Sequence, residues 1–353
     1  MRYKKLGKTG LSVSIIGFGA WGIGGGAYGP VDDDVSAEAL LTAYEKGINF
    51  FDTADVYGDG HSEEMIGKAL HHVRNSVALA TKVGTFPHFG FDMPQDFSPN
   101  HIRSSIEHSL RRLRTDHIDL YQLHSPPGEL LRQSDRIAET LGAMEALKKE
   151  GKVRHTGIST RSPEDGLFAA RDLGVEVVQV NFNLIDHRAI ENGLLTFCEK
   201  AGVGVIARTP FAFGFLTGKY SQGARFYPPD HRSNWPQEQI DCWAEAPHRF
   251  ASLNADSRRT MSQLALLFCT AHDVVSTAIP GIMKSSEALE NISAAALPPL
   301  TKEEILRISE IYQRNTFYVG RKSPSSGNSH SQKREAGDNE NTASHTLHTA
   351  LEG

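Results

Sequence analysis

The chain has 353 residues, 39% of them hydrophobic, and a formal net charge of −5 at pH 7. This hydrophobic content can build a sizeable core, and the small negative charge excludes the broad basic surface that attracts nucleic acid or anionic membranes. No stretch approaches the ~20 consecutive apolar residues of a membrane span, and the N-terminus lacks a signal core, so we expect a cytoplasmic protein with neither kind of partner. Cys198, Cys242 and Cys269 lie far apart without a C-x-x-C pair, as is usual in a reducing compartment.

The first motif in the chain is GFGAWG, residues 17–22, which fits the G-x-G-x-x-G fingerprint of a Rossmann dinucleotide domain. In a Rossmann domain the third glycine opens a helix whose N-terminus faces the pyrophosphate. Here the motif runs into GIGGGAYGP, and further glycines and a proline disfavour the first turns of a helix. We therefore expect a strand end followed by a loop, and not a Rossmann phosphate site.

After an expected hairpin around residues 8–10, short β-rich segments alternate with segments of helical period. The clearest helix begins with Ser98 as N-cap and Pro99 at the first helical position, and two more helical patterns, 35–47 and 191–202, each end on a glycine. Eight strands are expected, at 15–18, 49–53, 77–83, 119–123, 153–158, 175–180, 203–207 and 275–279. This alternation predicts an α/β fold, a (β/α)8 TIM barrel with an N-terminal β-hairpin and a C-terminal packing helix at 301–314.

Two segments depart from the alternation. Residues 211–249 are rich in Pro, Trp and Tyr, and we expect a long irregular loop that contacts substrate or cofactor. Residues 321–353 contain no aromatic residue, valine or isoleucine, so that burial cannot offset chain entropy. We therefore expect a barrel domain over 1–320 and a disordered polar tail over 321–353, whose His345 and His348 are too few for a metal site.

Polar side chains follow three consecutive predicted strands. Asp52 and Tyr57 come at the end of the second strand, Lys82 at the end of the third and His124 at the end of the fourth. The active site of a TIM barrel gathers at these strand ends. A lysine ammonium beside a phenol favours phenolate, so that a tyrosine can act as an acid near neutral pH, and an aspartate keeps the lysine charged. Asp55 also lies near this rim, but we expect it to be solvated and leave it outside the group.

These motifs resemble the aldo-keto reductase family. GINFFDTADVYGDGHSEEMIGKAL, residues 47–70, is similar to the family's first signature, and LATKVG, YQLHSPP, GIST, VVQVNFN, FGFLTGKY and AIPGIMKSSEALEN follow in the family's order. The resemblance covers residues 3 to about 315. It implies hydride transfer between an extended nicotinamide dinucleotide and a small carbonyl or alcohol substrate, an aldehyde, ketone or sugar. Tyr57 would donate the proton, Asp52 and Lys82 would adjust the acidity of Tyr57, and His124 would orient the carbonyl.

The resemblance also implies a set of cofactor contacts. Ser159, Thr160 and Gln179 would hold the nicotinamide carboxamide, while Ala20 and Trp21 would border its pocket. Lys219 and Arg225 would bind the pyrophosphate, and Glu290 and Asn291 the adenine. The whole implied set is Ala20, Trp21, Asp52, Ser159, Thr160, Gln179, Arg208, Thr209, Pro210, Phe211, Lys219, Arg225, Gly281, Lys284, Glu287, Glu290 and Asn291.

Three departures from the family pattern bear on the cofactor. Arg208 stands where an aromatic residue is common, so that a guanidinium plane would stack on the nicotinamide or pair with a carboxylate. Thr160 replaces the commoner Asn. Where relatives that bind NADP carry arginine, this chain has Met283 or Glu287, with Lys284 the cation beside them. A glutamate would repel the 2′-phosphate or accept a hydrogen bond from the ribose of NAD, so NADP(H) is favoured only narrowly over NAD(H).

Two other functions are compatible with parts of the sequence. One is a cofactor-binding regulatory or redox-sensing subunit with little turnover, like the potassium-channel β subunits that share this family. The other is a TIM-barrel metal hydrolase, but the chain lacks an H-x-H pair and a dense His and Asp cluster on a strand end. We therefore expect a reductase without a metal, and the sequence assigns neither its physiological substrate nor its oligomeric state.

Overall fold

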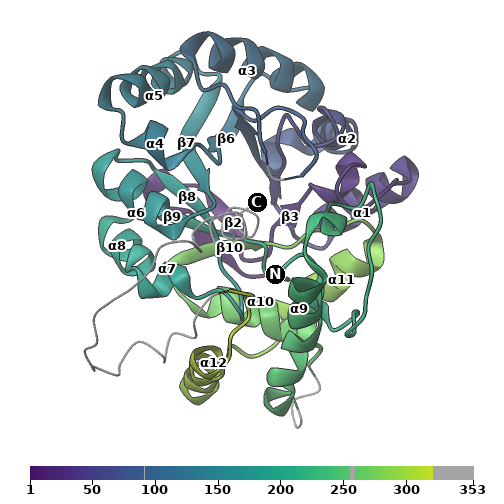
Figure 1. Cartoon of the computed structure of the whole chain (residues 1–353). Coiled ribbons are helices and arrows are strands. Elements are labelled where there is room, and N and C mark those ends of the chain that lie inside the picture. Colours follow the sequence, from purple (N-terminus) through teal and green to yellow (C-terminus); the bar gives the residue numbers. More distant parts are fainter. Residues whose placement is uncertain (91, 255–258, 321–353) are drawn as a thin grey trace, which may run out of the picture.

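Eight parallel strands form the centre of the computed structural model, which describes residues 1–90, 92–254 and 259–320. Hydrogen-bonded neighbours run in chain order, and helices surround the strands (Figure 1). The strands are β3 (Phe18–Gly19), β4 (Phe50–Asp52), β5 (Ala78–Val83), β6 (Ile118–His124), β7 (Val153–Thr160), β8 (Val177–Asn181), β9 (Gly204–Arg208) and β10 (Val275–Ile279). All eight coincide with predicted strands, and only the first begins more than two residues away.

The first and last strands meet and close the sheet. Gly17 N donates to the Ala278 carbonyl at 2.8 Å, and Ala278 N donates to the Ile15 carbonyl at 2.9 Å. Further along, Gly19 bridges Gly281 in parallel. The predicted (β/α)8 barrel is therefore confirmed, and Phe18–Gly19 lead into a short 3-10 helix, η2 (Gly22–Gly24), instead of a Rossmann helix.

The helices follow the predicted boundary signals. Ser98 accepts a hydrogen bond from His101 N and Pro99 opens α3, as the sequence predicts. The predicted helix at 191–202 is divided, because Gly193 adopts a φ of 81° between α7 and α8. The helices are α1 (Asp33–Glu45), α2 (His61–Leu70), α3 (Pro99–Leu113), α4 (Gly128–Leu131), α5 (Ser134–Lys149), α6 (Pro163–Asp172), α7 (Arg188–Glu191), α8 (Leu194–Ala201), α9 (Gln237–Arg249), α10 (Met261–Ala271), α11 (Ser285–Ala294) and α12 (Lys302–Arg314).

An N-terminal hairpin fills the lower end of the barrel. Strands β1 (Tyr3–Lys5) and β2 (Ser12–Ser14) pair antiparallel. Leu6, which follows β1, and Val13 of β2 are fully buried. They pack against inward-facing strand residues, among them Phe50, Leu120 and Ile206. This end of the barrel is a dry apolar core, so the open end lies at the carboxyl ends of the strands.

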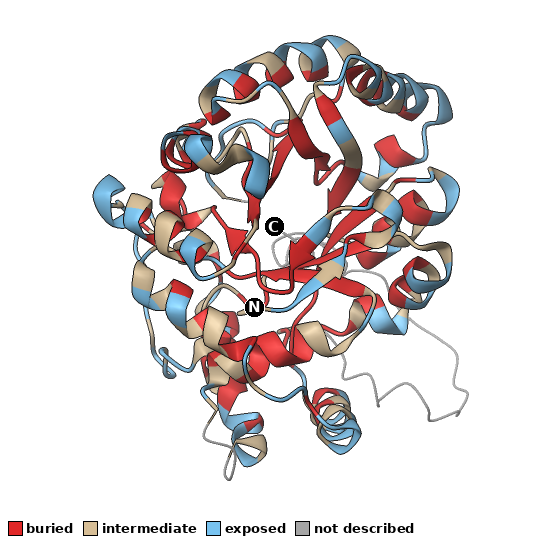
Figure 2. Ribbon diagram, turned by 180° about the vertical axis from the view of Figure 1, so that it is seen from behind, coloured by how far each residue is buried: buried red, intermediate tan, exposed pale blue. Residues whose placement is uncertain are grey.

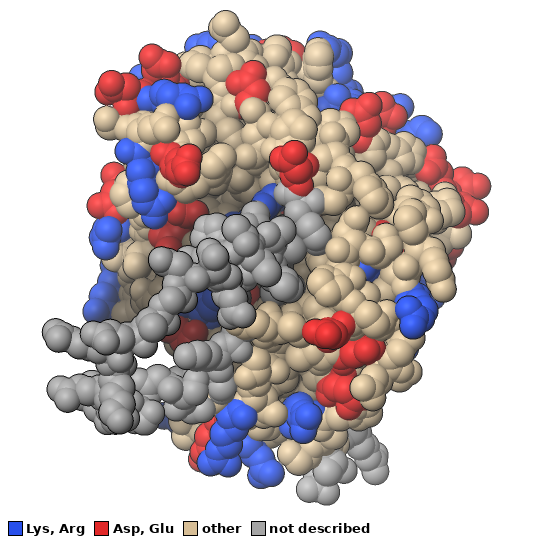
Figure 3. All heavy atoms as spheres, in the orientation of Figure 1, with Lys and Arg blue, Asp and Glu red and all other residues tan. Residues whose placement is uncertain are grey.

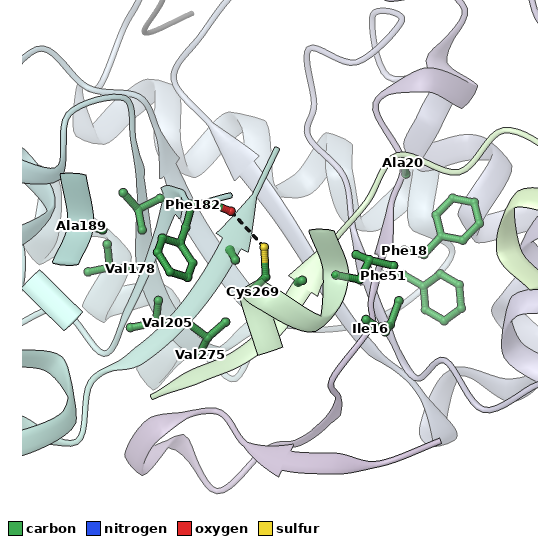
Figure 4. Close-up of a cluster of buried hydrophobic side chains, with 14 of the residues drawn as sticks. Ile16, Phe18, Ala20, Phe51, Val178, Phe182, Ala189, Val205, Cys269 and Val275 are labelled. Atoms are coloured by element: carbon green, nitrogen blue, oxygen red, sulfur yellow. Dashed lines mark hydrogen bonds between the residues drawn. The ribbon is translucent and has the colours of Figure 1, made fainter. Parts of the chain in front are cut away.

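A second core lies between the strands and the surrounding helices, and the strands are buried along most of their length (Figure 2). In one part of it Phe18 and Phe51 stack with ring centroids 5.7 Å apart. In another, Cys269 of α10 donates from Sγ to the Phe182 carbonyl at 3.2 Å (Figure 4). Along each strand, every second residue thus packs on the helices, and the residues between them face the barrel interior.

The segment 211–249 is not irregular throughout, which corrects the sequence expectation. Its last third is the helix α9, whose buried face includes Ile240, Trp243, Ala244 and Pro247 at helical spacing. Trp243 and Pro247, part of the aromatic and proline content that suggested a loop, belong to this face. The expected tail at 321–353 lies outside the described residues, and the division into barrel and tail stays a prediction.

The surface of the described residues carries both signs of charge. On the face in Figure 3, Lys and Arg side chains alternate with Asp and Glu around the molecule. None of the described helices is long and apolar enough to span a bilayer.

Candidate active site

A cavity of about 500 Å³ opens at the carboxyl ends of the strands. Asp52 of β4, His124 of β6, Gln179 of β8 and Arg208 of β9 all line it. Tyr57 reaches it from the turn after β4. The structure therefore brings together the polar groups that the sequence placed at separate strand ends.

The turn that carries Tyr57 packs directly on the glycine-rich loop. Gly58 has a φ of 61°, and a Cβ on it would lie 1.9 Å from the Gly24 carbonyl oxygen. A Cβ on Gly24 would in turn lie 2.9 Å from the Tyr57 carbonyl carbon. Because these backbones touch, the glycines after the first strand allow a close approach that holds Tyr57 over the barrel.

Lys82 lies beneath the cavity and is fully buried. Its Nζ donates to Asp52 Oδ1 at 2.5 Å, to the Thr53 carbonyl at 2.8 Å and to the Tyr57 hydroxyl at 3.3 Å. Burial alone would lower the pKa of Lys82, but the charge of Asp52 and the contact with Tyr57 outweigh it and raise the pKa. Lys82 is therefore a permanent cation whose three donors are all used.

Two glutamines hold the other oxygen of Asp52. Gln179 donates from Nε2 to Asp52 Oδ2 at 2.7 Å, and Gln122 donates to the same oxygen at 3.2 Å. Gln179 Oε1 also accepts from Ser159 Oγ at 3.2 Å. The sequence analysis missed Gln122, although it lies two residues before His124 and so faces the same side of β6.

His124 is neutral in this environment. Burial, followed by the charges of Lys82, Arg208 and Arg161, lowers the pKa of His124 well below its ordinary value. Its ring meets that of Tyr57 edge to face, with centroids 5.7 Å apart. Its Nδ1 is buried without a hydrogen-bond partner among the described residues. A neutral imidazole beside Tyr57 can bind a substrate oxygen without adding charge.

Asp55 is not the solvated residue that the sequence analysis expects. Its Oδ1 is buried and has no hydrogen-bond partner in the described part of the chain. Burial, helped by the nearby Glu63 carboxylate and opposed by Arg112 and Lys82, raises the pKa of Asp55 to about 8. The carboxyl group is therefore partly withdrawn from solvent, and the backbone N–H of Asp55 donates to the Lys82 carbonyl at 3.3 Å.

Most of the predicted cofactor residues lie around the same cavity. Those that line it are Ala20, Trp21, Asp52, Gln179, Arg208, Thr209, Pro210, Phe211, Lys219, Gly281, Glu287, Glu290 and Asn291. Ser159 and Thr160 are buried at the end of β7, adjacent to Gln179 through the Ser159 hydrogen bond. Arg225 and Lys284 are exposed and do not line the cavity.

The far end of the cavity contains both signs of charge. Glu287 Oε2 accepts from Met283 N at 3.0 Å, and its Oε1 lies 3.8 Å from Lys219 Nζ. Asn291 is buried, and its Nδ2 has no partner within the described residues. An unused amide donor at a cavity wall suits a ring nitrogen acceptor such as those of adenine, so the residues here fit a dinucleotide.

An aromatic wall faces Tyr57, and the sequence analysis identified only Trp21 among its members. Trp21 contacts Tyr28 and His231, with ring centroids 5.5 and 4.5 Å away, and His231 lies 5.1 Å from Trp235. All four residues line the cavity. The available signal was the aromatic content of 211–249, which indicated a binding loop but did not say which rings face inward.

Among the described residues, no three His, Cys, Asp or Glu side chains are grouped so that they could hold a metal ion.

Comparison with known proteins places the chain in a family. It matches the Aldo/keto reductase family model over residues 15–313. It is 34% identical over 300 residues to an L-galactose dehydrogenase from Arabidopsis thaliana, which covers 82% of this chain and 87% of that protein. A probable voltage-gated potassium channel subunit beta from Oryza sativa subsp. japonica is 30% identical over 331 residues, 89% of this chain and 97% of that protein.

Solved structures agree with the sequence relatives. The holo form of aldo-keto reductase AKR11C1 from Bacillus halodurans aligns with a TM-score of 0.74 and 31% identity, over 91% of this chain and 100% of that chain. The chain therefore belongs to the aldo/keto reductase family, whose members are NAD(P)H-dependent oxidoreductases.

Proposed function

We propose that this protein interconverts a small carbonyl compound, an aldehyde, ketone or sugar, and the corresponding alcohol, with Tyr57 as the proton donor. The observation that carries the proposal is the position of Lys82 Nζ, which contacts both Asp52 Oδ1 and the Tyr57 hydroxyl under the cavity. His124 lines the same cavity beside the Tyr57 ring.

The direction in which the Tyr57 hydroxyl proton points follows from the hydrogen-bond donors of Lys82. An ammonium has three donors and no acceptor, so the Tyr57 oxygen must accept from Lys82. The hydroxyl proton of Tyr57 then points to another acceptor, and the cavity is where a substrate oxygen would lie. Asp52 keeps Lys82 charged, and this positive charge stabilises the phenolate that remains after Tyr57 has given up its proton. Neutral His124 orients the same substrate oxygen.

The cofactor contacts are part of the proposal. Ser159, Thr160 and Gln179 would hold the carboxamide, Lys219 the pyrophosphate, and Glu290 and Asn291 the adenine. Arg225, which lies outside the cavity, is not part of this proposal. When bound, the reduced nicotinamide supplies the hydride, while the protein contributes position and electrostatic field. We favour NADP(H) over NAD(H) on the family resemblance, and the margin is narrow because Glu287 lies beside Lys219. A cytoplasmic location suits the three cysteines, which are all unpaired.

A substrate panel tests the proposal. Carbonyl compounds and alcohols are assayed with each of the four cofactor forms, by following the near-ultraviolet absorbance of the reduced nicotinamide. Turnover of at least one carbonyl–alcohol pair is expected, and it should need a nicotinamide cofactor. The absence of turnover across aldehydes, ketones and sugars, although the cofactor binds, would contradict the proposal.

That outcome would favour a second candidate, a regulatory or redox-sensing subunit that binds cofactor with little turnover. The similarity to a probable potassium channel subunit beta is the observation in its favour.

A further inference from the structure

Arg208 forms no ion pair with a carboxylate within the described residues, although the Asp52 charge acts on it through space. Its Nη2 donates to the Thr160 carbonyl at 3.2 Å, and its Nε is buried without a partner. The hydrogen bond of the guanidinium is therefore to a backbone carbonyl and not to a carboxylate. Burial lowers the pKa of Arg208 from 12.5 to about 10, so the side chain remains a cation at neutral pH.

The guanidinium lies where the nicotinamide ring is proposed to bind. Arg208 ends β9, and its contact with Thr160 shows that the side chain crosses β8 to reach the end of β7. There it is next to Ser159 and Gln179, the pair proposed to hold the carboxamide. Arg208 also lines the cavity.

Three other cations at or beneath the cavity lie near carboxylates. Lys82 is paired with Asp52, Arg232 with Asp230, and Lys219 lies near Glu287. Arg208 differs from these three cations because it forms no direct ion pair in the described part of the chain. A ligand that enters the cavity at this point therefore meets a positive field.

We propose that Arg208 makes this site bind the reduced nicotinamide cofactor more tightly than the oxidised one. The equilibrium between enzyme-bound reactants and products is thereby shifted toward oxidation of the alcohol. The inference rests on the proposed function. An oxidised nicotinamide ring is formally positive and a reduced ring is neutral, so a nearby guanidinium repels only the oxidised form. The phosphates and adenosine are the same in both forms, and their contribution cancels when the two affinities are compared.

The chemical balance follows the same reasoning. In alcohol oxidation the carbon that bears the hydroxyl gives a hydride, that is, a proton together with two electrons, to the nicotinamide ring. The C–O single bond becomes the double bond of a carbonyl. The hydroxyl proton passes to Tyr57, which enters this direction of the reaction as a phenolate. The ring loses its positive charge in this step, so the repulsion from Arg208 is relieved. The reverse reduction must create that charge beside the guanidinium.

The test is an equilibrium measurement. Quenching of tryptophan fluorescence, with Trp21 at the cavity wall, gives the Kd of the oxidised and reduced forms of each cofactor without turnover. For the wild type we expect the reduced form of the preferred cofactor to bind about tenfold more tightly or better, which corresponds to ~1.4 kcal/mol. Arg208→Met should lower this ratio about tenfold, and Arg208→Lys should keep most of it because the charge remains.

Lys219→Met is the matched control. This cation lies at the end of the cavity assigned to the phosphates, so its loss should weaken both redox forms by a similar factor and leave the ratio unchanged. Circular dichroism melts establish that each variant is folded, and Arg208→Gln replaces the methionine variant if that one is unstable. A ratio that is the same with and without the Arg208 charge would overturn the inference.

Failure of the inference and failure of the proposed function give different results. An enzyme that turns over the substrate panel but shows no dependence of the ratio on Arg208 overturns the inference alone. A protein that binds neither redox form overturns both.

Discussion

The two ends of the barrel interior are built by the same strands with opposite chemistry. On β4 the inward-facing residue changes from Phe50 to Asp52 within two positions, and on β9 it changes from Ile206 to Arg208. The lower layer is apolar and sealed by the hairpin, whereas the upper layer is polar and lines an open cavity. One period of the β-strand therefore separates a residue that stabilises the fold from one available for chemistry.

The difference teaches which variants should affect stability and which should affect function. In the lower layer the side chains are apolar and pack on one another, so that truncating one of them leaves a void. In the upper layer several buried polar atoms, such as Arg208 Nε and His124 Nδ1, have no hydrogen-bond partner within the described residues. Such groups add little to folding and are available to a ligand.

The largest effect is expected from the upper layer. Tyr57→Phe removes the hydroxyl that accepts from Lys82 while keeping the ring, so kcat should fall about a thousandfold or more. Cofactor affinity and melting temperature should stay close to the wild-type values, because no backbone contact changes. Steady-state kinetics on the best substrate of the panel and a cofactor titration provide the measurement. A variant that kept most of its turnover would rule out Tyr57 as the acid.

The converse prediction concerns the layer below. Phe50→Ala opens a cavity between the hairpin and the strands, and should lower the free energy of unfolding by about 3–5 kcal/mol. The molecules that remain folded should keep nearly the wild-type kcat, since Phe50 does not line the cavity. Urea denaturation followed by circular dichroism gives the first quantity, and kinetics below the transition the second. Loss of activity without loss of stability would break the distinction between the layers.

Sequence reasoning predicted the fold well because the pattern of this fold is local. Each strand is a short apolar run bounded by turn signals, and the cap at Ser98 and the glycine at 202 mark helix ends that the structure has at those residues. Asp52, Lys82 and His124 could be grouped because the ends of parallel strands share one side of a barrel.

What the sequence could not predict depends on side-chain direction in turns and loops. The burial of Asp55 is decided by how one turn folds, and no period applies there. The aromatic wall of Tyr28, His231 and Trp235 is formed by loops distant in the chain. In α9 the helical stripe around Trp243 was present, but proline and aromatic content suggested a loop.

Asp55 lies between the two layers in character, because its Oδ1 is buried and the side chain forms no ion pair within the described residues. Its pKa is raised to about 8, above the value near 3.9 of an unfolded chain, so the folded state holds a proton that the unfolded state has lost. The wild type should therefore lose stability as pH rises from about 4 to 8, by about 2–4 kcal/mol relative to Asp55→Asn. Urea denaturation across this pH range measures it.

Asp59→Asn is the matched control for that experiment. Asp59 lies in the same turn but is exposed, so its substitution should leave the pH dependence of stability unchanged. Parallel pH profiles for wild type and Asp55→Asn would show that Asp55 is ionised in the folded protein like any surface aspartate.

The smallest predicted effect concerns the polar layer at its far end, where cofactor choice is decided. Glu287→Arg replaces a carboxylate near Lys219 with a cation, and should tighten NADPH binding about tenfold while changing NADH binding little. Glu287→Gln keeps an acceptor for Met283 N and removes only the charge, so its gain should be smaller, about threefold. Fluorescence titration with both reduced cofactors measures the two shifts. Equal changes for NADPH and NADH would mean that residue 287 does not face the 2′-phosphate, and the cofactor preference would then have to come from the exposed Lys284 or from Lys219.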